Sequence, residues 1–144
     1  MALLQIYVRN QCLLFQVGIA GTIPDCLKRF LAGKGHMFVG VAIVGDMERL
    51  WLQHNIKLSK AVELQAMAPF IIQGKWRKVA SLVTLGRDLL DVDIEFKGTA
   101  VHFKNWHLPR LTEEQIKYAT SDAFISHKIW DKLQSKHGFD LHIS

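Results

Sequence analysis

The residues from Thr112 onward determine local structure more firmly than any other stretch of the chain, because they contain a reciprocal helix cap. The Thr112 hydroxyl can accept a hydrogen bond from the backbone N–H of Gln115, while the Gln115 side chain reaches back to Thr112. The apolar pattern that follows predicts a helix running to about Leu133. Tyr118 and Asp122 are four residues apart, so they lie side by side on this helix.

Tyr118 and Asp122 place a phenol beside a carboxylate on one helical surface. Such a pair suits a site where a divalent ion and a positioned water cleave a phosphodiester. The spacing is equally compatible with an ordinary packed helix, in which Tyr118 is half-buried and Asp122 is solvated. Both interpretations stay open at the level of the pattern.

The preceding sequence alternates strand and helix patterns. Two apolar runs, residues 2–8 and 12–17, flank Arg9, Asn10 and Gln11 and predict an antiparallel hairpin. The β-branched run 37–44 predicts a central strand covered on both faces. Further patterns predict three helices, one from Thr22 and Pro24 to Leu31, one over residues 46–53 and one over residues 76–90. Residues 61–72 form a mixed apolar stretch that Pro69 breaks. Residues 91–111 are expected to be loop-like, with a short strand at 100–103. This order predicts an α/β fold with helices packed on a sheet.

Composition limits the class of protein. With 144 residues, 49% of them hydrophobic and 22% charged, the chain fits one globular domain. The formal charge of +5 permits polyanionic partners without establishing them. Cys12 and Cys26 share no metal or redox spacing, which favours a reducing intracellular compartment, the nucleus or the cytoplasm. An amino terminus without acidic residues before Asp25 leaves a mitochondrial import signal as a less favoured alternative. The longest apolar run is far shorter than the roughly 20 residues of a membrane span, so no membrane is expected.

Six motifs along the chain occur in an order shared with one family. They are Ala2-Leu3-Leu4-Gln5-Ile6, Cys12-Leu13-Leu14-Phe15, the segment from Ile23 and Pro24 to Phe30 and Leu31, Phe38-Val39-Gly40-Val41-Ala42-Ile43 with Asp46, Asn105-Trp106, and the segment from Leu111 to Asp122. In this combination the chain resembles the Werner-type 3′-to-5′ exonucleases of the DEDDy class, and among them the small plant Werner-exonuclease-like proteins.

The resemblance implies a ribonuclease-H-like α/β fold with a mixed sheet. In that family four carboxylates from three motifs and one tyrosine organise two divalent ions, Mg²⁺ or Mn²⁺, at a nucleic-acid 3′ end. The second motif maps onto Asp46 and the third onto Tyr118 and Asp122. The resemblance therefore implies Tyr118, Asp122 and Asp46 as catalytic residues, with Asp122 and Asp46 as metal ligands.

One departure from the family pattern changes the expectation. The first motif, an Asp-x-Glu on the strand before residues 2–6, has no counterpart in the sequence. We therefore expect residues 1–144 to form a single truncated exonuclease-like domain without its first central strand, with weak or no catalysis. The alternative is a noncatalytic module that self-associates or pairs with a protein partner through an open sheet edge. A third alternative binds nucleic acid without cutting it.

Other candidates have a structural interpretation that we favour. Asp91, Asp93 and Glu95 read as a charged loop, and Asp140 and His142 read as a frayed tail rather than a relocated motif. Asp46 alone could be a helix cap. The seven histidines show no paired metal spacing, and Trp106 is expected to brace the loop before the last helix. Four basic residues are candidates for phosphate contacts, with solvated charge as the alternative for each: Lys104, Arg110, Lys117 and Lys128.

Overall fold

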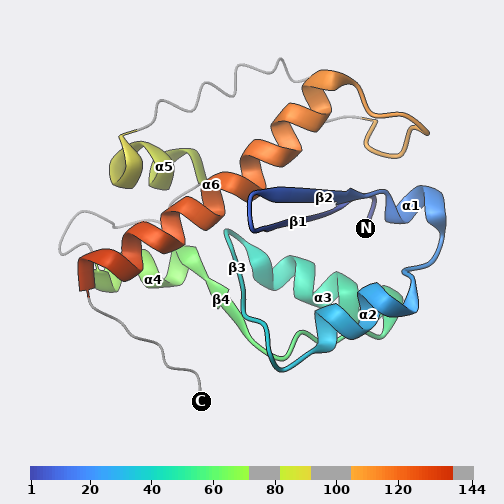
Figure 1. Cartoon of the computed structure of the whole chain (residues 1–144), viewed down its shortest axis with the longest axis horizontal. Coiled ribbons are helices and arrows are strands. Elements are labelled where there is room, and N and C mark those ends of the chain that lie inside the picture. Colours follow the sequence, from blue (N-terminus) through green and yellow to red (C-terminus); the bar gives the residue numbers. More distant parts are fainter. Residues whose placement is uncertain (72–81, 92–104, 138–144) are drawn as a thin grey trace.

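The computed structural model describes residues 1–71, 82–91 and 105–137. Its strands are β1 (Leu4–Val8), β2 (Gln11–Phe15), β3 (Phe38–Gly40) and β4 (Ala61–Glu63), and its helices are α1 (Val17–Ala20), α2 (Asp25–Ala32), α3 (Ile43–His54), α4 (Leu64–Ile71), α5 (Leu82–Leu90) and α6 (Glu113–His137). The expected α/β class is confirmed. In Figure 1 the long helix α6 runs diagonally from the left edge to the top of the molecule, with the β1–β2 hairpin beside its middle.

The hairpin forms where the two apolar runs predict it. β1 and β2 pair antiparallel, with Val8 opposite Gln11, so the connecting turn has two residues. Arg9 and Asn10 both have positive φ, 48° and 62°. Two left-handed residues are what a tight hairpin turn needs to match the twist of its strands. The Tyr7 hydroxyl donates a 3.0 Å hydrogen bond to Asn10 and braces this turn.

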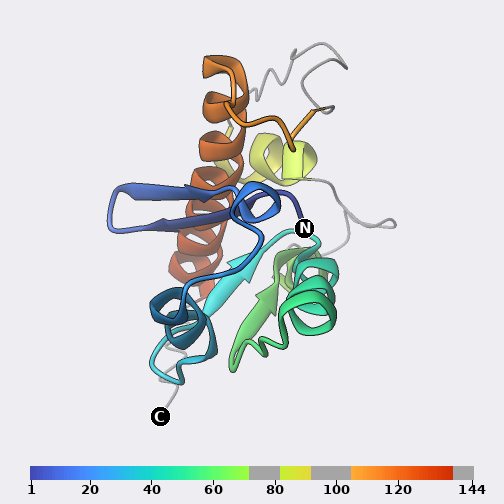
Figure 2. The ribbon, with the colours of Figure 1, turned by 90° about the vertical axis from the view of Figure 1, so that its right-hand side faces the viewer.

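The second pair of strands, β3 and β4, is parallel, with Phe38 opposite Ala61. Parallel and antiparallel pairing both occur, as expected for a mixed sheet. In the described part of the chain, however, the two pairs stand as separate two-stranded sheets. Figure 2 shows the hairpin and the β3–β4 pair on the same side of α6, at different heights.

The prediction of one strand over residues 37–44 is wrong at its carboxyl end. β3 stops at Gly40 and α3 already begins at Ile43. Between them Ala42 has φ 59°, a left-handed conformation that breaks the strand. Its N–H donates a 2.9 Å hydrogen bond to the Glu63 carboxylate, a contact 21 residues away in sequence. This tertiary contact overrides the β-branched pattern of the segment.

Two hydrophobic clusters hold the elements together. One joins α4 and α5 to α6, with Leu64, Leu85 and Ile129 fully buried. The other joins the hairpin, α2 and α3, with Leu4, Leu31 and Leu50 at its centre. α6 contacts β1, β2 and β3, so one helix supports both sheets. No helix in the described part of the chain is long and apolar enough to cross a membrane.

The cap that predicts α6 is present. The backbone N–H of Gln115 donates to the Thr112 hydroxyl at 3.1 Å, and the N–H of Thr112 donates to the Gln115 side chain at 2.9 Å. The helix runs four residues beyond Leu133, to His137. Pro69 lies inside α4 rather than at a break. The helix predicted over 76–90 is present as α5 over its described residues, from Leu82 on. Other predictions lie outside the described residues: residues 72–81, the strand at 100–103, Lys104, Asp93, Glu95, Asp140 and His142.

Candidate active site

Asp46 lies in the first turn of α3, directly after the left-handed turn that ends β3. The interpretation of Asp46 as the helix cap is wrong, because Ala42 occupies the cap position and no side chain caps this helix. The Asp46 carboxylate instead accepts a 3.1 Å hydrogen bond from Arg49 Nη1, and its side chain is 53% exposed. The Arg49 guanidinium therefore holds the Asp46 carboxylate, about half of which stays accessible to a ligand.

Asp122 and Tyr118 share one face of α6, as their spacing predicts. Burial, and next the charge of Asp46, raise the pKa of Asp122 to about 6. Burial and the charge of Asp122 also raise the pKa of the Tyr118 phenol, which stays a neutral donor at physiological pH. Folding thus brings two carboxylates from distant parts of the chain within electrostatic range of each other.

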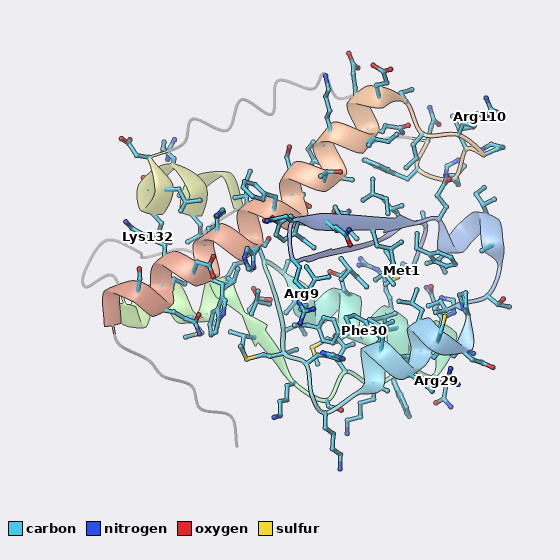
Figure 3. All side chains as sticks on the ribbon, viewed as in Figure 1. Met1, Arg9, Arg29, Phe30, Arg110 and Lys132 are labelled. Carbon is cyan, nitrogen blue, oxygen red and sulfur yellow. The ribbon has the colours of Figure 1, made fainter. Side chains whose placement is uncertain are left out.

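The two carboxylates line one cavity of about 970 Å³. Residues of β1 and β3 form its walls, and α6 contributes Ala123, Ser126 and Trp130. Figure 3 labels Arg9 from the hairpin and Phe30 from α2, which line the same space. Like charges that share a cavity disfavour each other's ionised form. A bound cation would reduce this repulsion between the two carboxylates.

Glu63 bonds to the turn that precedes α3 and was not found from the sequence. Besides the N–H of Ala42, its carboxylate accepts a 3.2 Å hydrogen bond from the N–H of Gln65. Burial raises the pKa of Asp46, Arg49 opposes this change, and Glu63 adds to it. The signal available in the sequence was one acidic residue at the end of an apolar run, which is too weak to identify a role.

His127 and Asp131 were also missed, although both line the cavity. His127 Nε2 and an Asp131 oxygen are 3.2 Å apart. The Tyr7 ring packs 5.1 Å from the His127 ring and 5.4 Å from that of Phe124. The four-residue spacing of His127 and Asp131 was the available signal. These contacts dock the hairpin on α6 beside the carboxylates.

Three of the four candidate phosphate-binding residues, Arg110, Lys117 and Lys128, lie in the described part of the chain. Arg110, Lys117 and Lys128 are exposed, and Lys128 Nζ lies 5.4 Å from the centre of the Phe124 ring. Figure 3 shows Arg110 on the loop before α6. Trp106 braces this loop as expected, with its ring 6.0 Å from that of Tyr118.

The donor atoms near Asp46 and Asp122 suit Mg²⁺ or Mn²⁺. Both ions prefer oxygen ligands, and Mg²⁺ is often held by one or two carboxylates together with substrate phosphates. Among the described residues no group of three or more His, Cys, Asp or Glu side chains could hold a metal ion. Within the described part of the chain, Asp46 and Asp122 would therefore need further oxygens from a ligand to hold such an ion.

The α/β fold and the paired acidic residues are those of a nuclease-type domain. A family model described as 3′-5′ exonuclease matches residues 1–137, and the chain belongs to this family. It is 32% identical over 133 residues to the mouse bifunctional 3′-5′ exonuclease/ATP-dependent helicase WRN, covering 92% of the chain and 9% of that protein. It is 26% identical over 127 residues to a 3′-5′ exonuclease of Arabidopsis thaliana, covering 87% of the chain and 42% of that protein.

A solved structure shares the fold. The structure described as the apo form of the nuclease matches with a TM-score of 0.74 and 16% identity, over 88% of this chain and 59% of that one. The chain spans less than half the length of the curated relatives it matches. The expected Werner-type resemblance is thus confirmed at the level of the exonuclease family, and membership of the plant group stays a prediction.

Proposed function

We propose that this chain acts on or binds nucleic-acid 3′ ends, with weak or no catalysis. The observation that carries the proposal is the meeting of Asp46 and Asp122 in one cavity, close enough for the charge of Asp46 to raise the pKa of Asp122. Membership of the 3′-5′ exonuclease family supports the substrate class. Catalysis is expected to be weak because two carboxylates alone position an ion poorly, and poor positioning is costly in rate.

Each residue has a defined part in this proposal. Asp46 and Asp122 provide oxygens for Mg²⁺ or Mn²⁺, which when bound neutralises phosphate charge and activates a water. The protonated Tyr118 phenol donates a hydrogen bond that orients the attacking water. Arg110, Lys117 and Lys128, together with Lys104, provide candidate contacts to the phosphate backbone.

The test is digestion of an oligonucleotide with a 3′ overhang in Mg²⁺ or Mn²⁺. The unmodified chain is compared with Asp46→Ala and Asp122→Ala, and Glu48→Gln on the exposed side of α3 serves as the matched control. We expect slow or absent digestion, with binding of the overhang measured in parallel by fluorescence anisotropy. Fast digestion that survives both alanine variants would refute these residue roles.

A noncatalytic interaction module is the second candidate. β1 pairs only with β2, and β3 only with β4, among the described residues. Open strand edges can pair with a second copy or with a protein partner. Concentration-dependent size in solution that is insensitive to Asp46→Ala and Asp122→Ala would favour this function. Salt-sensitive oligonucleotide binding without digestion, retained in variants lacking Tyr118 and Asp122, would instead favour a nucleic-acid binder.

A further inference from the structure

Arg49 places a positive charge directly beside a candidate metal ligand. Its Nη1 lies 3.1 Å from Oδ1 of Asp46, and the Arg49 side chain is 57% exposed. The same Nη1 is 3.8 Å from the point that a Cβ atom at Gly45 would occupy. The bare backbone of Gly45 therefore leaves room for the guanidinium to lie along the first turn of α3.

Most donors of the Arg49 guanidinium are unused in this arrangement. A guanidinium has five N–H donors, and the bond to Asp46 takes one of them. The side chain makes no other hydrogen bond within the part of the chain that the structure describes. Since it is also more than half exposed, the remaining donors can reach a second acceptor at the surface. A planar fork of donors suits two oxygens of one phosphate group.

The charges around Asp46 favour such an acceptor once an ion is bound. Asp46 acts electrostatically on Asp122, and Glu63 acts on Asp46, so Arg49 lies at a cluster of negative charge. A divalent ion held by Asp46 and Asp122 would reverse this balance and repel the guanidinium. The negative group that such an ion attracts in turn is a phosphate of the nucleic acid. That phosphate would attract Arg49 as well.

We propose that Arg49 is a phosphate-binding residue of the candidate site. Its guanidinium pairs with Asp46 while no ion is bound, and it moves to a phosphate of the nucleic-acid 3′ end when Asp46 and Asp122 hold Mg²⁺ or Mn²⁺. The exchange leaves each negative group beside a positive one. This inference rests on the proposed function and deepens it, because it adds a contact beside the ion to the four phosphate contacts predicted from the sequence.

The test is the affinity of the full chain for an oligonucleotide with a 3′ overhang, measured by fluorescence anisotropy in Mn²⁺ and in EDTA. Phosphorothioate linkages at the 3′ end slow digestion. We expect Arg49→Gln to weaken binding about tenfold in Mn²⁺ and less than about threefold in EDTA, where Asp46 still holds the guanidinium. In Mn²⁺ the dependence of the logarithm of affinity on the logarithm of salt concentration should also lose about one unit of slope.

Two further variants separate this role from general charge. Arg49→Lys keeps the charge but not the fork, so it should weaken binding in Mn²⁺ less than Arg49→Gln does. It also serves as the test if Arg49→Gln does not fold. Arg29→Gln is the matched control for the change in charge, because Arg29 is an exposed residue of α2 that does not line the cavity (Figure 3). Its effect should be the same in Mn²⁺ and in EDTA.

The possible failures of the two proposals differ in this experiment. A loss in Arg49→Gln that is equal in Mn²⁺ and in EDTA, or no larger than that of Arg29→Gln, would overturn the exchange. Binding in Mn²⁺ that is lost in Asp46→Asn but kept in Arg49→Gln would overturn this inference and leave the proposed function standing. If the unmodified chain binds no oligonucleotide in either condition, both fail together.

Discussion

At the residue scale, Asp122 is the most perturbed group of the candidate site. Its pKa of about 6 lies above the ordinary aspartate value of 3.8, so the folded chain holds this proton more tightly than the unfolded chain. The associated stability is complete below pH 3.8 and is lost as the pH rises to about 6. Ionised Asp122 therefore destabilises the fold at neutral pH.

Replacing this carboxylate should reverse that loss. Asp122→Asn stays neutral, so at pH 7 it is expected to raise the free energy of unfolding by on the order of 1 kcal/mol, after allowing for solvent screening. The gain should vanish near pH 4. Urea unfolding at both pH values measures it, with Glu48→Gln as the control. A gain that is the same at both pH values would mean that Asp122 is not perturbed.

Glu63 is expected to shape the turn that presents Asp46. Glu63→Ala leaves the N–H groups of Ala42 and Gln65 without this acceptor and should cost about 1–3 kcal/mol in urea unfolding. Glu63→Gln keeps an acceptor oxygen and should cost less. It also removes the negative charge that raises the pKa of Asp46, so NMR titration should find that pKa lower. Equal losses in the two variants would contradict this role.

At the element scale, the cap of α6 ties the helix to the loop before it. Thr112→Ala should cost about 1 kcal/mol. Gln115→Ala should cost more, because Gln115 is only 4% exposed and also donates to the Asn105 carbonyl. The double variant should lose less than the sum of the single losses, since both belong to one network. Thermal unfolding measures these losses, and Thr112→Ser, which keeps the hydroxyl, is the control expected to be nearly as stable as the unmodified chain. A loss in the double variant equal to the sum of the single losses would show that the two side chains act independently.

The elements differ in how far the sequence determines them. The hairpin and α6 follow from local chemistry, the turn at Arg9 and Asn10 and the cap at Thr112. The end of β3 was not predictable, because it depends on the bond from Ala42 to Glu63, a residue from another element. Likewise α1 is a four-residue turn without a capping side chain, and it left no pattern to find.

At the scale of the whole molecule, the candidate site depends on how the elements meet. Spacing alone placed Tyr118 beside Asp122, but only the family resemblance connected either of them to Asp46. α6 makes this connection physically, because it packs against both β1 and β3 and carries Asp122 to the cavity that Asp46 lines. Glu63 reaches the same region through a tertiary contact with Ala42 that no sequence spacing encodes.

The most direct test of the account is the affinity for Mn²⁺ in the presence of an oligonucleotide with a 3′ overhang. The unmodified chain, Asp46→Asn, Asp122→Asn and the double variant are compared by isothermal titration at pH 7. We predict that each single change weakens Mn²⁺ binding about tenfold or more, and that the double change adds little, because both oxygens serve one ion. Mn²⁺ affinity unchanged in both single variants would contradict a shared site at Asp46 and Asp122.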